Sequence, residues 1–289
     1  MRGCWRASKA RLRNSRHPDP RLKGSWSMTM LELVAISVGN SRVHVGHFIG
    51  DEMNENVDLV HEDMTRMVEV VSRMWKASEK AERRAVVVAS VNDEVAGRIT
   101  SMLEDQLGEE VYMVGTDLPI PLKLSLDPEA IPGTDRLLCA AAAWEVLKQA
   151  CIIVNAGTAI TIDFVDGKGV FHGGTIAPGV QMQLDSMTNG TEALPPIDFK
   201  RPEGEPFGRN TADAMLRGAY HGARGLTWRV VEEYARSYEA FPLVIATGGD
   251  AQVLYGDDEL INRIIDDLEL RGIALTARNA LIESAELEE

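Results

Sequence analysis

Two short turns in this sequence carry residues that could hold an anion. The Gly-Asn-Ser turn at residues 39–41 interrupts a strand-forming stretch at 34–48, and the Ala-Gly-Thr turn at 156–158 interrupts a second one at 152–164. Glycine permits positive φ and lets a ligand approach the backbone closely. Successive turn N–H groups form a concavity that suits phosphate, and the neighbouring polar side chains add donors. The two turns could therefore hold a polyphosphate between them.

The alternative is that each turn is an ordinary hairpin connection, for which Gly-Asn is a common sequence. Two observations favour binding. Each half of the chain begins with a predicted hairpin that contains such a turn. A third glycine pair, Gly248-Gly249, ends the apolar segment at 242–249. A strand that ends in glycines is where an α/β sheet admits a nucleotide. Neither a Walker loop nor a G-x-G-x-x-G fingerprint accompanies these turns.

The elements that must position the turns are predicted to repeat. The first half contains a hairpin at 31–48, a helix at 60–82, a strand at 85–91, a helix at 93–107, a strand at 110–115 and a helix at 134–149. The second half contains a hairpin at 151–171, a glycine-rich loop at 172–179, helices at 180–189 and 210–237, a strand at 242–249, and helices at 259–268 and 273–286. Such alternation favours α/β layers with largely parallel strands.

Charge and composition limit the partners of the chain. Its formal charge is −14, and because residues 1–27 hold eight Lys or Arg and one acid, the remainder carries −21. Such a body repels the nucleic-acid backbone, and no apolar run reaches the ~20 residues that span a bilayer. We expect neither a nucleic-acid partner nor a membrane. An anionic substrate would need local positive charge, backbone N–H donors or a metal ion to offset this field.

The cysteines and the N-terminal segment complete the bulk picture. Cys4, Cys139 and Cys151 lack metal-ligand spacing, so core filling is expected for the last two. Few cysteines fit a reducing cytoplasm. Residues 1–30 are basic and have no apolar stretch typical of a secretory signal. They are interpreted as a disordered extension or as the product of an upstream start codon.

Six segments resemble, in order and spacing, those of the type III pantothenate kinases. They are SVGNSRVHVG, PGTDRLLCAAAAW, NAGTAITIDF, HGGTIAPGVQMQLDSMTNGTEALP, FGRNTADAMLRGAYHG and IATGGDA, and the match covers nearly all of residues 31–280. The resemblance implies the architecture of the acetate and sugar kinase, Hsp70 and actin superfamily. Two related actin-like (ribonuclease H-like) α/β domains, expected here at 31–150 and 151–289, would enclose a nucleotide cleft.

The resemblance also implies an activity. It predicts ATP-dependent phosphorylation of pantothenate to 4'-phosphopantothenate, the first step of coenzyme A biosynthesis. ATP would act with Mg²⁺, and a monovalent cation (K⁺ or NH₄⁺) would assist. The enzyme would be a cytoplasmic homodimer with its active site near the subunit interface.

Individual residues acquire roles from the same resemblance. Asp135 resembles the family's general base, although an acid in the first turn of a helix also suits the helix dipole. Arg136 would face the anionic substrate, or else form a surface ion pair. Thr211 resembles a second pantothenate contact, or else a helix cap. The implied pantothenate residues are Gly133, Thr134, Asp135, Arg136 and Thr211, and the implied ATP residues are Ser37, Val38, Gly39, Asn40, Ser41, Arg42, Val43, His44 and Thr158.

Two positions depart from the family pattern. The first motif of the family begins with an Asp that helps to organise the metal–phosphate end of the site, and here that position is Ser37. The motif of the second half also begins with Asp, which helps to bind the monovalent cation, and here it is Asn155. Asn keeps a carbonyl ligand but loses the charge on which cation affinity partly depends. The sequence therefore leaves two hypotheses, an active kinase with an altered cation arrangement and a noncatalytic relative that binds a nucleotide or metabolite.

Overall fold

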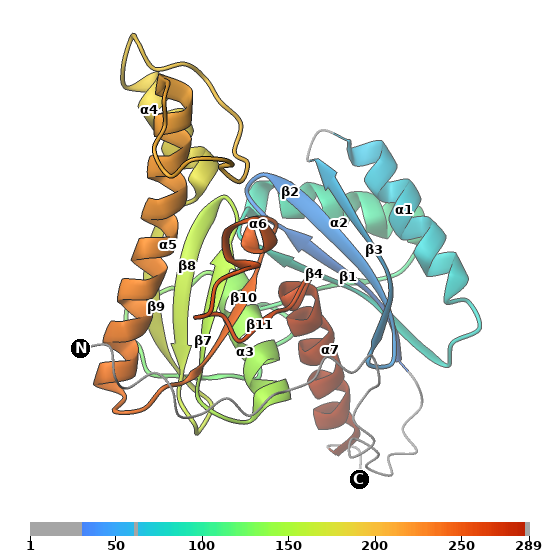
Figure 1. Cartoon of the computed structure of the whole chain (residues 1–289). Coiled ribbons are helices and arrows are strands. Elements are labelled where there is room, and N and C mark those ends of the chain that lie inside the picture. The colour runs from blue at the N-terminus through green and yellow to red at the C-terminus, as the bar shows by residue number, and fades with distance from the viewer. Residues whose placement is uncertain (1–30, 61–62, 287–289) are drawn as a thin grey trace.

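The computed structural model describes residues 31–60 and 63–286 and contains two mixed β-sheets (Figure 1). The first sheet has the order β3-β2-β1-β4-β5, from β1 (Leu31–Val38), β2 (Arg42–Ile49), β3 (Glu52–Val60), β4 (Arg83–Ser90) and β5 (Val111–Met113). The second has the order β11-β10-β7-β8-β9-β6, from β6 (Lys123–Leu124), β7 (Cys151–Ala156), β8 (Ala159–Val165), β9 (Val170–Pro178), β10 (Leu243–Thr247) and β11 (Arg263–Ile264).

The two sheets repeat one topology. In each, the first strand pairs antiparallel with the second and parallel with the fourth, as β1 does with β2 and β4 and as β7 does with β8 and β10. The short strand β6 is an addition at the edge of the second sheet, where it pairs with β9. The prediction of two related α/β units is confirmed.

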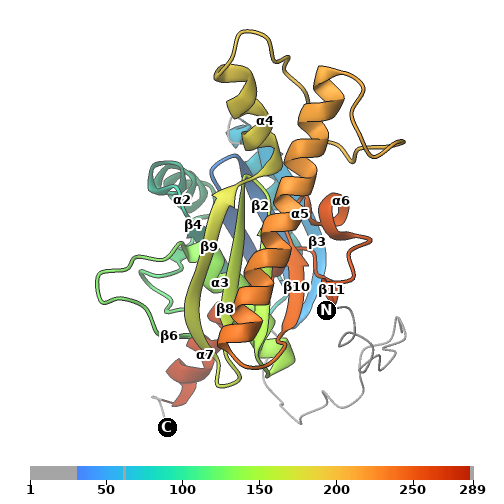
Figure 2. The same cartoon turned by 60° about the vertical axis from the view of Figure 1, so that its left-hand side comes forward.

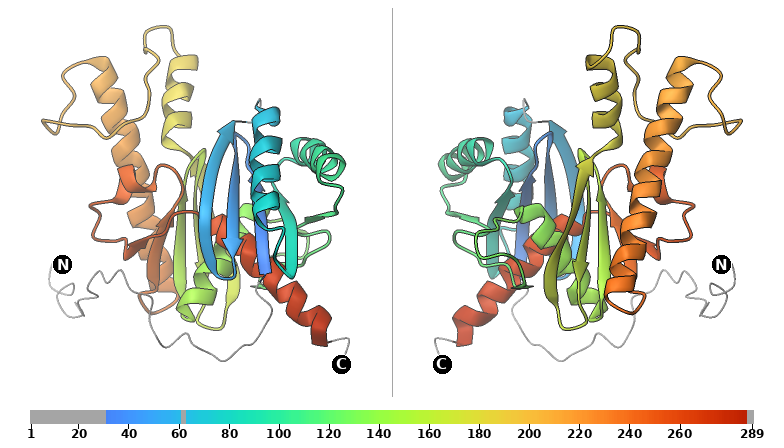
Figure 3. Two further views of the ribbon diagram at one scale, coloured as in Figure 1. Left: turned by 90° about the vertical axis from the view of Figure 1, so that its right-hand side faces the viewer. Right: turned by 90° about the vertical axis from the view of Figure 1, so that its left-hand side faces the viewer.

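Helices separate and cover the two sheets. Helices α1 (Met64–Ala77) and α2 (Asp93–Leu107) pack on the outer face of the first sheet (Figure 3), and α5 (Thr211–Ser237) lies along the outer face of the second (Figure 2). Helices α3 (Thr134–Leu147) and α7 (Leu268–Glu286) lie between the sheets. Helix α4 (Val180–Asn189) and the start of α5 project beyond the sheets at the top of Figure 1.

The two central helices are exchanged between the halves. Helix α3 follows the first sheet in the chain, yet its alanine-rich face packs on Ile153, Val165 and Phe171 of the second sheet. Helix α7 follows the second sheet, yet Leu270 and Ile273 pack on the strands of the first. Each half therefore supplies the helix that covers the inner face of the other.

Helices α3 and α7 approach each other so closely that only glycine fits at their crossing. A Cβ atom on Gly272 would lie 2.4 Å from the carbonyl oxygen of Leu138, well inside van der Waals contact. Leu138 is fully buried, and Ile273 beside the crossing is equally buried. The backbones of α7 and α3 are thus in direct contact. This contact fixes the position of each helix along the other, and therefore where both helices begin relative to the sheets.

Two segments differ from the sequence prediction because strand pairing overrides local composition. Residues 172–178, predicted as part of a glycine-rich loop, form the second part of β9 and pair antiparallel with β8. Residues 52–60, for which no strand was predicted, form β3. Most of β3 is exposed at the sheet edge. Met53, Val57 and Leu59 alternate along it, but Glu55 interrupts this apolar face, so the alternation that indicates a strand is weak.

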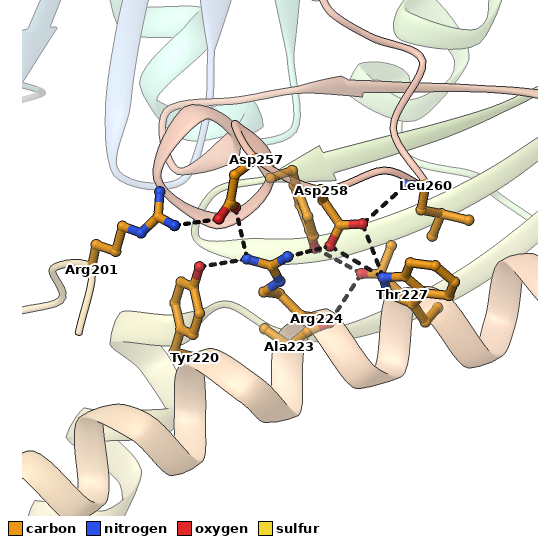
Figure 4. Close-up of polar contacts among 10 residues, drawn as sticks. Arg201, Tyr220, Ala223, Arg224, Thr227, Asp257, Asp258 and Leu260 are labelled. Atoms are coloured by element: carbon orange, nitrogen blue, oxygen red, sulfur yellow. Dashed lines mark hydrogen bonds and ion pairs between the residues drawn. The ribbon is translucent and has the colours of Figure 1, made fainter. Parts of the chain in front are cut away.

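The predicted helix at 259–268 is also wrong. Helix α6 (Ala251–Tyr255) ends before it, and a loop leads to β11. Figure 4 shows the reason. The buried carboxylate of Asp258 accepts hydrogen bonds from the Leu260 N–H and the Trp228 indole, and it pairs with Arg224 of α5. A side chain that satisfies the backbone in this way favours a loop over a helical turn.

Other bulk expectations can be compared with the described residues. Cys139 and Cys151 are buried free thiols in the layer between α3 and the second sheet, which confirms core filling. Burial raises the pKa of Cys151 to about 12, so this thiol stays protonated. Within the part of the chain that the structure describes, no helix is long and apolar enough to cross a membrane. Cys4 and the interpretation of residues 1–30 lie outside the described residues.

We expect Gly272→Ala to destabilise the protein, because the new methyl group must push α7 away from the Leu138 carbonyl. Overpacking of this kind costs about 1–3 kcal/mol in the free energy of unfolding, which denaturant titration measures. Gly225→Ala is the matched control. Gly225 is an exposed position in α5 with no neighbouring atom within 4 Å of an added Cβ, so alanine should be neutral or stabilising there. Equal effects of the two substitutions would contradict the close crossing.

Candidate active site

A cleft of about 580 Å³ opens between the two sheets at the carboxyl ends of β1, β7 and β10. It contains Gly39 and Asn40 of the first predicted turn and Gly157 and Thr158 of the second, together with the start of α3 and the start of α7. The described residues that line it include Ser37, Gly39, Asn40, His44, Asn56, Asp58, Asp135, Asn155, Gly157, Thr158, Thr161, Thr247, Gly248, Gly249, Asp266, Asp267 and Glu269.

The two turns meet across this cleft. The hydroxyl of Ser41 lies 3.1 Å from the hydroxyl of Thr158, within hydrogen-bond distance. The third glycine pair joins them, because Gly248 has φ +95° and a Cβ there would lie 2.4 Å from the carbonyl oxygen of Ala156. The sequence grouped these three segments by pattern alone, and the fold brings them into one site.

Two carboxylates stand on the floor of the cleft at equivalent points of the repeat. Asp135 is the second residue of α3, and Glu269 is the second residue of α7. The Ser37 hydroxyl donates a 2.6 Å hydrogen bond to Oε1 of Glu269. The pKa of the Glu269 carboxyl is raised to about 7, chiefly by burial, against the lowering effect of the Ser37 hydroxyl and with a further rise from the charge of Asp135.

Acidic side chains predominate among the charged residues that line the cleft. Five carboxylates line it, those of Asp58, Asp135, Asp266, Asp267 and Glu269, whereas no Lys or Arg occurs among its described lining residues. His44, the one lining imidazole, is paired with Asp58 at 2.6 Å. A bare polyphosphate would be repelled here. Neutral N–H and O–H donors and an added cation are what can offset its charge here.

Arg136 lies beside Asp135 but turns away from the open cleft. Its Nε lies 3.1 Å from Oδ1 of Asp163, and its Nη2 donates to the same carboxylate, in a forked arrangement. The side chain of Arg136 is 12% exposed and that of Asp163 is 2% exposed. Although burial lowers it, the pKa of the Arg136 guanidinium is raised overall by the hydrogen bonds and charge of Asp163. The sequence alternative of a surface ion pair is wrong because the pair is buried.

The remaining predicted residues divide into three groups. Val38 and Val43 point into the core between the first sheet and α1, so only their backbones can face a ligand. Arg42, Gly133 and Thr134 border the cleft in sequence but are not among its lining residues. Thr211 begins α5 and is exposed, outside the cleft. The cap of that helix is Asn210, whose side chain accepts from the Asp213 N–H, so the cap alternative for Thr211 is wrong.

Asn155 sits in a row of side chains that carry oxygen. It pairs in register with Thr161 on β8 and with Thr247 on β10, and all three line the cleft. Residues that are neighbours in register project to the same face of a sheet. The row therefore presents an amide and two hydroxyl groups, all with oxygen atoms, the ligand type that hard cations prefer.

The sequence analysis missed Asp163 and Glu269. Asp163 lies inside the NAGTAITIDF segment but has no recognisable spacing to Arg136, so only the fold shows their pairing. Glu269 could have been found from the internal repeat. Aligning the start of α7 with the start of α3 places Glu269 opposite Asp135. The wrong helix at 259–268 concealed this equivalence.

Fold and cleft together define an α/β protein with two related halves and an acidic cleft between them, and comparison with known proteins identifies the family. The family model of type III pantothenate kinase matches residues 33–233. Type III pantothenate kinase of Syntrophotalea carbinolica is 28% identical over 250 residues, which cover 84% of this chain and 97% of that protein. The enzyme of the same name from Dehalococcoides mccartyi is 29% identical over 249 residues, covering 84% and 96%.

A solved structure agrees at the level of the fold. A conserved protein of the Baf family of transcriptional activators from Campylobacter jejuni superposes with a TM-score of 0.52 at 20% identity, covering 86% of this chain and 98% of that one. This likeness supports the architecture alone. On the family match, the chain belongs to the type III pantothenate kinase family.

Arg136→Met should leave the Asp163 charge buried without its partner. Breaking a buried pair in this way costs about 3–5 kcal/mol in the free energy of unfolding, which chemical denaturation measures. Arg73→Met is the matched control, because Arg73 also makes a two-nitrogen contact with a carboxylate, that of Glu55, but at the surface. Its loss should stay below about 1 kcal/mol. Similar losses for both substitutions would show that burial does not increase the contribution of the Arg136–Asp163 pair to the free energy of unfolding.

Proposed function

We propose that this protein transfers the γ-phosphoryl group of ATP to the primary hydroxyl of pantothenate, and so forms 4'-phosphopantothenate and ADP in the first step of coenzyme A biosynthesis. The observation that carries the proposal is the meeting of the two glycine turns across a cleft whose floor holds Asp135. Family membership supplies the identity of the acceptor. The backbone N–H groups of the two turns would bind the phosphates.

Asp135 is the proposed general base. Its carboxylate accepts the proton of the pantothenate hydroxyl as the hydroxyl oxygen forms its bond to the γ-phosphorus. The bond from that phosphorus to the β,γ-bridging oxygen breaks, and ADP leaves with the electron pair. Because Arg136 is held by Asp163, the start of α3 is anchored while Asp135 is left to the substrate. Positioning of this kind supplies much of the rate of phosphoryl transfer.

The residues of the cleft fit ATP that arrives with Mg²⁺. Their donors are carboxylate, amide and hydroxyl oxygens, which are the ligands of hard cations. Among the described residues no group of three or more His, Cys, Asp or Glu could hold a metal ion by itself. This agrees with a cation held jointly by the nucleotide and one or two carboxylates. Bound Mg²⁺ would neutralise charge on the phosphates.

The proposed substrate site requires a second subunit if Thr211 takes part. Thr211 lies on the projecting end of α5 and outside the cleft that contains Asp135. A homodimer that joins the projecting α4–α5 regions could bring Thr211 of the partner subunit to the pantothenate bound near Gly133 and Thr134. An apolar groove between these helices, lined by Met182, Met187 and Met215 among others, supports contact there.

The proposed domain division remains 31–150 and 151–289, with the exchanged helices α3 and α7 packed between the two sheets. The proposed location is the cytoplasm, which agrees with the buried free thiols of Cys139 and Cys151. A monovalent cation, K⁺ or NH₄⁺, is proposed to bind beside Asn155, where Thr161 and Thr247 add oxygen atoms. With no carboxylate at position 155, its effect on the rate should be weak.

Asp135→Asn should abolish most of the activity, because an amide cannot accept the hydroxyl proton. We expect kcat to fall by about 10²- to 10⁴-fold in a coupled assay that contains ATP, Mg²⁺ and pantothenate. Glu94→Gln is the matched control, since Glu94 is the exposed second residue of α2 and tests the helix-dipole effect alone. Wild-type protein that binds ATP but does not turn over pantothenate would instead favour the noncatalytic hypothesis.

Asn155→Asp should create or strengthen stimulation by potassium, because the new carboxylate adds charge to the oxygen row. Initial rates in KCl and in a matched salt without K⁺ or NH₄⁺ measure the effect. Asn262→Asp is the control, since its Oδ1 can still accept from the Val244 N–H away from the cleft. An Asn155→Asp enzyme with an unchanged potassium response would count against this position for the cation.

A further inference from the structure

Glu269 is hydrogen-bonded to position 37, where the resemblance leads us to expect a carboxylate. The resemblance to the type III pantothenate kinases implies an Asp at position 37, and this chain has a buried Ser there. The hydroxyl of Ser37 donates to Oε1 of Glu269 at 2.6 Å. Position 37 of β1 therefore carries no charge, but it is in direct hydrogen-bond contact with a carboxylate at the start of α7.

Three observations set Glu269 apart from an ordinary acid at a helix start. It lines the cleft with Gly39, Asn40 and Thr158 of the two turns. It forms no ion pair with a Lys, Arg or His in the part of the chain that the structure describes. Its pKa is raised chiefly by burial and further by the charge of Asp135, and the Ser37 hydrogen bond and the charge of His44 only partly offset this rise. A cation at this point would satisfy both carboxylates.

We propose that Glu269 replaces the carboxylate of position 37 and holds the divalent cation of the ATP complex at the phosphate end of the cleft. The inference rests on the proposed function, and it deepens it by assigning the metal–phosphate contact to α7 instead of β1. Ser37 orients Glu269 through its hydroxyl. The loss of the Asp at position 37 is then a relocation of the charge, which keeps the site competent for phosphoryl transfer.

The alternative is a structural role, in which Glu269 complements the dipole of α7 and fastens Ser37. The two roles differ in their response to moving the charge. Glu269→Gln keeps the shape and can still accept the Ser37 hydrogen bond, but it removes the charge. The double variant Ser37→Asp/Glu269→Gln returns a carboxylate to position 37. A purely structural role predicts no effect of either change on metal affinity.

The test measures Mn²⁺ binding by electron paramagnetic resonance, on the full chain with a saturating non-hydrolysable ATP analogue. We expect Glu269→Gln to weaken Mn²⁺ binding roughly 10- to 100-fold, the range for residues that support a metal site. The double variant should recover most of this loss. Ser37→Ala, which keeps the charge but loses the hydroxyl, should have an intermediate effect. Glu94→Gln at the start of α2 is the control for the helix dipole.

Two results would overturn the inference. One is unchanged Mn²⁺ affinity in Glu269→Gln, and the other is a loss that Ser37→Asp does not restore although the double variant unfolds at the wild-type temperature. Should Glu269→Gln fail to fold, the double variant and Ser37→Ala still provide the comparison. Failure here is distinct from failure of the proposed function. Wild-type turnover of pantothenate with Mn²⁺ binding independent of Glu269 would remove only the inference, and the reverse pattern would remove only the function.

Discussion

The direct contact between the backbones of α3 and α7 is the constraint on which the rest of the structure depends. Gly272 lies against the carbonyl of Leu138, so neither helix can shift along the other without a clash. Each helix covers the inner face of the opposite sheet. Because both begin at the cleft, this single crossing places Asp135 and Glu269 side by side beneath the two glycine turns. The internal repeat thus produces a site with one acid from each half.

Placing acids on the floor of an anion-binding cleft determines what the cleft can bind. Its described lining contains five carboxylates and no Lys or Arg, so repulsion excludes a free polyphosphate. A metal-bound nucleotide is different, because the cation satisfies the acids and the turns supply neutral N–H donors. The guanidinium of Arg136, which follows Asp135, is held by Asp163 and stabilises the start of α3. Selectivity for the metal complex therefore follows from the absence of positive side chains among these residues.

Much of this arrangement could be predicted from the sequence, and the failures have physical causes. The hairpins, α2 and α5 follow from local patterns, because turn glycines and helical periodicity act over a few residues. Local patterns could not show that Arg136 meets Asp163 or that β3 closes a sheet edge, since both depend on pairing across the fold. The loop held by Asp258 was taken for a helix, and this error hid Glu269. The internal repeat contained the missing information, because Glu269 is the counterpart of Asp135.

The central claim is that one triphosphate lies between the two turns and beside Asp135. A crystal structure of the protein with a non-hydrolysable ATP analogue, Mg²⁺ and pantothenate tests it most directly. The account predicts phosphate oxygens at the turns at 39–41 and 157–158, with the Asp135 carboxylate in hydrogen-bond contact with the pantothenate hydroxyl that faces the γ-phosphorus. A nucleotide bound elsewhere, or an Asp135 carboxylate remote from that hydroxyl, would contradict it.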